Sequence, residues 1–260
     1  MMIILSPAKR LSIKPRGNAP IATVPRFRFE TEAIVKELKN LNINELIDLL
    51  KVSSKLGQEN HLRFTSWQWS EAKTDSTLPA LMAYDGDAFN ALKAWEFNQG
   101  ELLRAQKSLR IISALYGMLR PLDLIMPYRL EMQASLSVNR KKDLYAFWGE
   151  RLAQSLLDDM SHYNDSVIIN LASQEYSKSV LPYLTSEKIA VVTPVFYQLV
   201  NQKFQFSALY SKQARGKMTR FIIQNAIDNP EHLVAFHDDN YLFHEGLSNQ
   251  KQLVFYRHLR

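Results

Sequence analysis

The sequence predicts an α/β protein with an irregular, mixed α+β order of elements, folded as a single compact domain over residues 1–260. Two short apolar runs, at residues 2–5 and 167–171, have the length and composition of buried strands. Stretches with helical periodicity lie between them, but helices and strands do not alternate as regularly as in a simple βαβ protein. No internal repeat and no change in composition marks a linker, and a chain of 260 residues can bury one large core.

The N-terminal part is predicted to contain one strand, an irregular segment and a short helix. Ser6 and Pro7 end the strand at residues 2–5. Residues 14–29 are rich in proline and glycine, so we expect them to be irregular. Thr31 precedes an amphipathic stretch and is the expected N-cap of the helix.

Residues 44–64 have the outline of a helix-hairpin-helix element. Asn44 is the expected cap of the first helix, residues 52–57 form a polar turn that contains Lys55 and a glycine, and residues 58–64 form the second helix. Such hairpins present main-chain N–H groups to a phosphate at the start of the second helix. Helix pairs in ordinary protein cores have the same outline, so the pattern leaves both interpretations open.

The remaining elements follow from shorter patterns. We expect a loop at residues 65–80, a helix passing into a strand at 101–112, strands at 167–171 and 189–196, a half-exposed strand at 203–208, a helix at 211–226, and short final strands at 233–236 and 253–256.

Composition restricts the chemistry. The chain has no cysteine, which excludes disulfides, thiolate zinc sites, iron–sulfur clusters and a cysteine nucleophile, and fits a reducing compartment. The first residues do not form a secretory signal, and no apolar run approaches the roughly 18 residues of a membrane span, so we expect a cytoplasmic protein. The net charge of +6 favours anionic partners, namely nucleic acid, phosphorylated metabolites or a membrane surface. A solvated basic surface without a role is the alternative.

The most basic local feature is the predicted helix that follows Ser211. It carries Lys212, Arg215, Lys217 and Arg220 without an acidic residue. If Ser211 caps this helix, the first cations fall near its N-terminus, where the helix dipole disfavours them by a few tenths of a kcal/mol each. A bound phosphate would resolve that conflict because it accepts hydrogen bonds from both N–H groups and cations. A solvated basic face is again the alternative.

Residues 115–132 are strongly apolar but contain two prolines, so they must pack as buried, irregular chain. Arg120, Asp123, Arg129 and Glu131 lie among these apolar residues, and buried charges require partners. Two arrangements fit this pattern. The charges form internal pairs that hold the loop, or Arg129 and Glu131 line a cleft and face a ligand.

Two further motifs place polar groups where binding sites are common. Asp85 and Asp87 flank a glycine, a pattern that suits a tight turn, a pair of metal ligands or a general base. Ser173, Glu175, Tyr176 and Lys178 follow the strand at 167–171, and strand ends carry the binding groups of open α/β sheets. The histidines and acids between 237 and 245 match no metal-ligand spacing, and nucleotide-binding and hydrolase motifs are absent from the sequence. We therefore predict no metal site and no cofactor.

Several of these stretches together resemble the YaaA peroxide-stress-resistance family. The matching segments are residues 5–9, Gly86 and Asp87, the run LRIISALYGMLRPLDLIMPYRLEM from Leu109, residues 142–148, residues 170–178, residues 214–221 and residues 253–255. They cover essentially the whole chain. The chain departs from the family pattern at residues 84–89, and at residues 212–213 it has Lys-Gln where a second lysine is expected.

The resemblance implies a cytoplasmic bacterial protein that limits iron-mediated damage under peroxide stress. It also implies a positively charged cleft, a helix-hairpin-helix element and binding to duplex or branched DNA with little sequence preference. No catalytic activity is implied, but an enzyme that acts on a nucleobase or nucleotide in the same cleft, similar to a glycosylase, is the alternative. Direct iron sequestration is the least favoured hypothesis.

Two sets of residues follow from these hypotheses. The DNA-binding set consists of Lys9, Lys55, Arg120, Arg129, Ser173, Lys178, Lys212, Arg215, Lys217 and Arg220. The candidates for the catalytic alternative are Lys9, Asp87, Arg129 and Glu131. We expect the key members of both sets to meet in one cleft.

Overall fold

A mostly parallel β-sheet runs through the centre of the protein. The computed structural model describes residues 1–258 except 13, 15, 18–20, 73, 163–165 and 187. Along the sheet the strands are β4 (Gly117–Leu119), β3 (Leu109–Ser113), β1 (Met2–Leu5), β6 (Val167–Leu171), β7 (Ala190–Val200), β10 (Gln252–His258) and β9 (Leu242–Phe243), with β8 (Lys203–Gln205) paired to β7. Neighbours from β3 to β10 are parallel, and β4, β8 and β9 are antiparallel additions at the edges.

The central strands β1 and β3 are short, and they are buried on both faces. All four residues of β1 and all five of β3 are buried. Continuous apolar runs of this kind are typical of strands covered on both sides by helices. The predicted mixed α/β class is therefore confirmed, and the parallel centre is more regular than the order of elements suggested.

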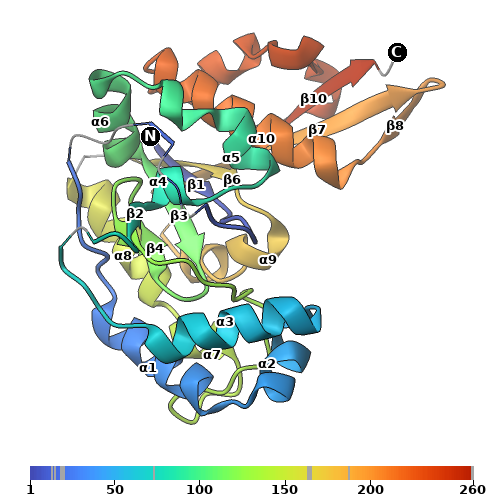
Figure 1. Ribbon diagram of the computed structural model, residues 1–260. Coiled ribbons are helices and arrows are strands. Elements are labelled where there is room, and N and C mark those ends of the chain that lie inside the picture. The colour runs from blue at the N-terminus through green and yellow to red at the C-terminus, as the bar shows by residue number, and fades with distance from the viewer. Residues whose placement is uncertain are drawn as a thin grey trace.

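Three helices that follow β1 form a separate group at one end of the protein, opposite β7, β8 and β10 (Figure 1). They are α1 (Arg28–Asn40), α2 (Ile43–Leu50) and α3 (Ser54–Ser66). The chain then forms β2 (Leu78–Pro79), α4 (Ala80–Ala83), α5 (Asp87–Leu92), η1 (Ala94–Glu96) and α6 (Gln99–Ser108), of which α5 and α6 lie at the opposite end from this group (Figure 1). The predicted loop at residues 65–80 is largely correct, because only the end of α3, the two residues of β2 and the first residue of α4 fall within it.

Two predicted helix starts were wrong. Helix α1 begins before Thr31, whose buried hydroxyl instead donates to the carbonyls of Phe27 and Leu115. Helix α2 is capped by Asn42 rather than Asn44, because Asn42 and Glu45 form a reciprocal capping box. A glutamate three residues after an asparagine was the signal that the sequence analysis missed.

The α2–α3 pair is more tightly joined than predicted. Its turn is only residues 51–53, with Lys51 in the left-handed conformation, and Lys55 lies in the first turn of α3. Gly57 lies inside α3, where a Cβ atom would stand 2.1 Å from a side-chain carbon of Ile47. The glycine therefore serves close helix packing and not the turn. Whether the pair acts as a helix-hairpin-helix element stays a prediction.

The C-terminal half supplies the remaining helices. These are α7 (Leu144–Trp148), α8 (Arg151–His162), α9 (Gln174–Ser177), η2 (Leu181–Tyr183), α10 (Ala208–Gln224), η3 (Pro230–Ala235), η4 (Asp238–Asn240) and η5 (Glu245–Leu247). The strand predicted at 233–236 was wrong, because that segment is mostly the 3₁₀-helix η3, which Pro230 begins. No described helix is long and apolar enough to cross a membrane.

Helix α10 begins three residues earlier than predicted. Ser207 is its first flanking residue, so the buried Ser211 lies within the helix and is not its cap. Lys212 and Arg215 consequently fall in the second and third turns, beyond the part of the helix where the dipole acts. The predicted conflict between these cations and the helix dipole does not exist in this structure.

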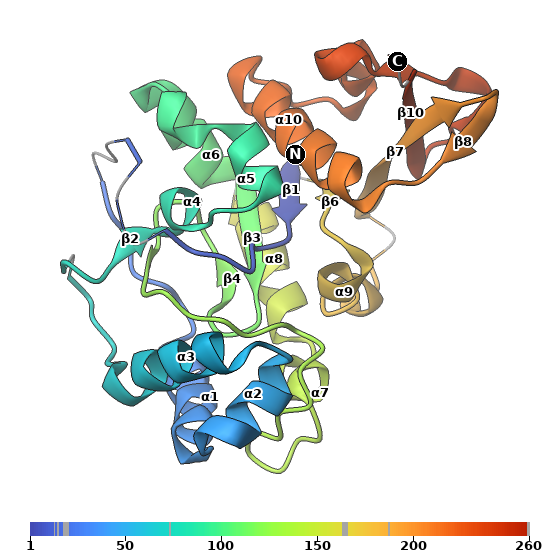
Figure 2. The same ribbon diagram turned by 45° about the vertical axis from the view of Figure 1, so that its right-hand side comes forward.

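Helix α10 packs closely against α5, as the turned view shows (Figure 2). Gly216 makes this possible, since a Cβ atom there would lie 1.9 Å from the carbonyl oxygen of Ala88. The contact fixes the position of Asp87, which begins α5, relative to the cations of α10. One glycine thus sets the distance between two walls of the site described below.

The apolar segment at 115–132 is held by internal charge pairs, as one of the two arrangements predicted. Arg120 pairs with the fully buried Asp123 at 2.8 Å and donates to the carbonyl of Val24. Strand β4 and the short β5 (Leu124–Ile125) interrupt the otherwise irregular chain. Arg120 therefore stabilises the conformation of residues 115–132.

Candidate functional site

A pocket of about 440 Å³, here called the main pocket, opens at the carboxyl ends of β1 and β6. These strands are neighbours, and the chain leaves β1 toward β3 on one side and later reaches β6 on the other. Such a change of direction is where open α/β sheets bind ligands. The main pocket is lined by residues 5–10 after β1, residues 85–90 at α5, Leu171, Ser173, Glu175 and Tyr176 near α9, and Lys212 and Arg215 of α10.

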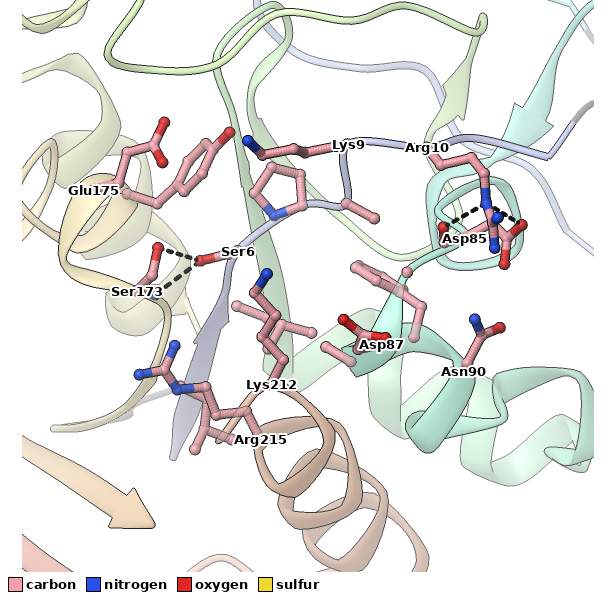
Figure 3. Close-up of a pocket in the computed structure, with 18 residues that line it drawn as sticks. Ser6, Lys9, Arg10, Asp85, Asp87, Asn90, Ser173, Glu175, Lys212 and Arg215 are labelled. Carbon is pink, nitrogen blue, oxygen red and sulfur yellow. Dashed lines mark hydrogen bonds and ion pairs between the residues drawn. The ribbon is translucent and has the colours of Figure 1, made fainter. Parts of the chain in front are cut away.

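Two serines join the strand ends at the floor of the main pocket (Figure 3). The main-chain N–H of Ser173 donates to Ser6 Oγ at 2.8 Å, and the Ser6 hydroxyl donates to Ser173 Oγ at 3.2 Å. Among the described residues, no acceptor receives the proton of the Ser173 hydroxyl. That hydroxyl is therefore available to donate to a ligand.

Two cations of α10 reach into the main pocket, and no described residue is their counter-ion. Figure 3 shows Lys212 and Arg215 extending from the helix toward Ser6 and Ser173. Neither side chain has a hydrogen bond, ion pair or ring contact within the described parts of the chain. Burial alone lowers the pKa of the half-buried Arg215 guanidinium. An arginine that loses hydration without gaining a partner is an arrangement that a bound anion would stabilise.

The acids of the main pocket differ in their surroundings. Burial raises the pKa of Asp85, but hydrogen bonds and charges from Arg10, Asn90 and Arg16 outweigh it and leave the pKa below its usual value. Asp85 pairs with Arg10 at 2.9 Å and with Arg16 at 3.2 Å. Its charge is thus neutralised within the protein.

Asp87 and Glu175 face the main pocket from opposite sides. Asp87 has no side-chain partner among the residues that the structure describes. Burial, together with the nearby Glu131 carboxylate, raises the pKa of Glu175 even though Lys9 and main-chain N–H groups act against it. The pocket therefore combines a free carboxylate with one that holds its proton more tightly than usual.

A smaller pocket of about 230 Å³, here called the side pocket, adjoins the main pocket through Lys9, which lines both. Lys9 Nζ lies 2.8 Å from a carboxylate oxygen of Glu131, and Arg129 lies 3.3 Å from the other one. The buried Nε of Arg129 has no hydrogen-bond partner in the part of the chain that the structure describes. Lys51 at the end of α2 also lines the side pocket, which links this region to the α2–α3 pair.

The structure brings together only part of the predicted set. Lys9, Asp87, Ser173, Lys212 and Arg215 line the main pocket, and Arg129 and Glu131 line the side pocket. Lys55 is exposed on α3 and lines neither pocket, and Lys178 lies over the ring of Tyr145 at 4.1 Å.

Several cations of the predicted DNA-binding set are engaged in the fold, beginning with Lys9 and Arg129, which both pair with Glu131. Arg120 is paired with Asp123, and Lys217 is paired with Asp239 at 3.1 Å. Arg220 donates to the carbonyls of Leu92 and Lys93 and to Glu96. Lys217 and Arg220 therefore contact neighbours outside the main pocket.

Some pocket residues were not among the predicted site residues. Ser6 was missed although it directly follows the buried strand β1, and the similar position of Ser173 two residues after β6 was the usable signal. The pairing of Arg10 with Asp85 left no sequence signal, because the partners come from segments far apart in the chain. Within the described ranges no three His, Cys, Asp or Glu side chains gather as metal ligands.

The arrangement of the two pockets suits an anion held by α10 and the strand ends. A sequence model of the family described as peroxide stress protein YaaA matches residues 1–247. The match covers nearly the whole chain, so the chain belongs to this family.

Proposed function

Starting from membership of this peroxide stress family, we propose that the chain binds DNA in the cytoplasm and thereby limits iron-mediated oxidative damage. Iron that is bound near DNA converts peroxide into radicals that attack the sugar, so a protein that covers phosphates reduces damage at the covered sites. The DNA phosphates are recognised by charge, and little sequence preference follows from that mode of binding.

The observation that carries the proposal is the pair of cations on α10. Lys212 and Arg215 project into the main pocket, and neither is neutralised by an acid in the described chain. Surface cations of a folded protein commonly find a carboxylate, as Lys217 and Arg220 do one turn further along the same helix. Cations without such partners are free to replace the counter-ions of a phosphate.

The proposed DNA path continues from α10 to the α2–α3 pair. It runs from Lys212 past Lys9, which joins the two pockets, to Lys51 at the side pocket and to the exposed Lys55 at the start of α3. The start of α3 also offers main-chain N–H groups to a phosphate. The path therefore has groups that can bind phosphate at both ends.

One observation favours an enzyme as the second candidate. Asp87 and Glu175 face the same pocket, and burial raises the pKa of Glu175. A carboxyl group with a raised pKa that shares a pocket with a second carboxyl group is a usual arrangement for general acid and general base. A glycosylase-like reaction on a nucleobase would use them, and release of free base from DNA by the wild-type protein but not by Asp87→Asn would support it.

Binding of a duplex of about 20 base pairs with hydroxyl ends, measured by fluorescence anisotropy over a range of salt concentrations, tests the DNA path. With about four to six phosphates neutralised, the slope of log affinity against log salt is expected near −4 to −5 for any sequence. Lys212→Ala and Lys55→Ala are each expected to reduce the magnitude of the slope by about one unit.

Lys217→Ala is the matched control, because this lysine is paired with Asp239. It is expected to leave the slope unchanged. An affinity that does not depend on salt would contradict DNA binding through phosphates, and equal effects of all three lysine variants would contradict the path.

A further inference from the structure

We propose that the main pocket binds a phosphomonoester, that is, a terminal phosphate of a DNA strand or the phosphate of a free nucleotide. The inference deepens the proposed function and rests on it only for DNA as a source of the phosphate. The pocket's own shape, charge and hydrogen-bond donors carry the rest.

The shape of the main pocket favours a terminal group. Its space of about 440 Å³ lies below the surface between β1, α5, α9 and α10. A phosphate within a DNA backbone is linked to sugar on both sides, so it can approach the cations at the edge of the pocket but cannot enter the recess as deeply as a terminal group. A monoester has one such link and three free oxygens, and the volume leaves room for the sugar attached to it.

The charges match a dianion. A phosphomonoester carries a charge of about −1.5 to −2 at neutral pH, whereas a backbone phosphodiester carries one negative charge. Arg215 and Lys212 provide two positive charges that form no ion pair with an acid of the described residues. Because Arg215 is half-buried, its guanidinium has lost hydrogen bonds to water, and an anion that reaches it compensates for that loss.

The hydrogen-bond donors add direction. Ser6 holds the main chain and hydroxyl of Ser173 in place, and the Ser173 hydroxyl is left free to donate. Figure 3 shows Arg215 reaching toward this serine. The free oxygens of a monoester thus meet a neutral donor at the strand ends and cations from α10.

The acids orient the ligand. Asp85 is neutralised by Arg10 and Arg16, so it does not oppose an anion. Asp87 is free and stands on α5, across the pocket from Ser173. Its charge directs the phosphate toward Ser173 and Arg215, and its oxygens can accept a hydrogen bond from a sugar hydroxyl or a base amino group.

The proposal connects the pocket with peroxide stress. Radicals that abstract hydrogen from deoxyribose break the strand and leave terminal phosphates. A protein that prefers such ends would collect at the lesions that peroxide produces, while its cationic path holds the intact duplex beside them.

Four probes test the proposal: two otherwise identical nicked duplexes, one with a phosphate and one with a hydroxyl at the nick, and dTMP and thymidine as competitors. Two or more charged hydrogen bonds predict that the full-length protein binds the phosphorylated nick about tenfold more tightly than the hydroxyl nick. dTMP but not thymidine is expected to compete for the phosphorylated nick.

Two variants locate the site. Ser173→Ala is expected to reduce the affinity for the phosphorylated nick by about threefold or more and to affect the hydroxyl nick less, because it removes a neutral donor. Arg215→Gln is expected to abolish the preference. Thermal unfolding of each variant shows whether it is folded, and Ser173→Ala keeps the main-chain hydrogen bond to Ser6.

The outcomes separate this inference from the proposed function. Equal affinity for both nicks, with duplex binding still dependent on salt and no competition by dTMP, would overturn the inference and leave DNA binding intact. Binding of dTMP without binding of either nick would support the pocket with a free nucleotide as its ligand and contradict the DNA path. A preference that Ser173→Ala and Arg215→Gln both leave unchanged would overturn the assignment to this pocket.

Discussion

The two halves of α10 carry the same kind of residue and put it to different use. In the first half, Lys212 and Arg215 project into the main pocket without a counter-ion among the described residues. In the second half, Lys217 is paired with Asp239, and Arg220 is held by Glu96 and two main-chain carbonyls. The comparison shows that the position of acids elsewhere in the chain, and not the number of cations in a segment, decides which cations are free to bind.

The two halves of α10 also differ in how their cations affect the stability of the protein. Arg220 gains hydrogen bonds that stabilise the contact between α10 and the segment after α5, whereas Arg215 loses hydration and gains no partner. Burying an unpaired charge destabilises a protein. We therefore expect the first half of α10 to contribute less to the stability of the protein than the second half, and to provide the cations that bind a ligand.

The largest effect is expected at Gly216, the residue that separates the two halves. Gly216→Ala places a methyl group 1.9 Å from the main-chain oxygen of Ala88, which cannot move without shifting α5. We expect the free energy of unfolding to fall by about 3 kcal/mol. Chemical denaturation followed by circular dichroism measures the change.

Gly100→Ala in α6 is the matched control. Gly100 is exposed, and the nearest atom to an added Cβ is a side-chain oxygen of Asn98 at 3.3 Å. Its effect is expected to stay within about 1 kcal/mol, because alanine favours the helix and Asn98 can adjust. Equal losses in both variants would contradict the close packing of α10 on α5.

The next effect is expected at Arg220. Arg220→Ala removes hydrogen bonds of 3.1, 3.0 and 2.8 Å to Leu92, Lys93 and Glu96. Because Glu96 is partly exposed, we expect a loss of only about 1 to 2 kcal/mol in the free energy of unfolding. Arg215→Ala is expected to leave stability unchanged or to raise it slightly, since it removes an unpaired, half-buried charge. The opposite order of the two variants would show that Arg215 has a structural partner.

How far the sequence could predict these features depends on the distance between interacting residues. The strands at 2–5 and 167–171 were predictable because continuous apolar runs of this length report burial on both faces. The basic content of α10 was also visible. Its true start at Ala208 was not, because Ser207 and Ser211 are both residues of the type that caps helices, and Ser207 forms no capping hydrogen bond that would distinguish it.

The ion-pair partners of the cations of α10 could not be predicted. Glu96 and Asp239 lie far from Arg220 and Lys217 in sequence, and nothing in the local pattern indicates their pairing. Internal pairing of the charges at residues 115–132 was foreseen as one of two arrangements because buried charges require partners, and Arg120 with Asp123 is one such pair. Burial indicates that a charge needs a partner, whereas the identity of a distant partner requires the fold.

A smaller effect concerns the acids opposite the free cations. Burial and Glu131 raise the pKa of Glu175, so as pH falls this carboxylate is protonated at a higher pH than an ordinary glutamate. Its protonation removes a negative charge from the pocket. Sulfate stays a dianion at these pH values, and we expect it to bind roughly two- to fivefold more tightly. In Glu175→Gln this pH dependence is expected to disappear. Calorimetric titration with sulfate at several pH values measures it, and an unchanged pH dependence in the variant would remove Glu175 from the site.

The direct test of the contrast within α10 is the salt dependence of duplex binding for Arg215→Ala and Arg220→Ala, measured in parallel with the wild-type protein. If only the first half of α10 contacts phosphate, Arg215→Ala reduces the magnitude of the slope of log affinity against log salt by about one unit on every DNA sequence. Arg220→Ala leaves the slope as it is, because that guanidinium is held by Glu96 and main-chain carbonyls. A slope that Arg220→Ala reduces, or that Arg215→Ala leaves unchanged, would contradict the account.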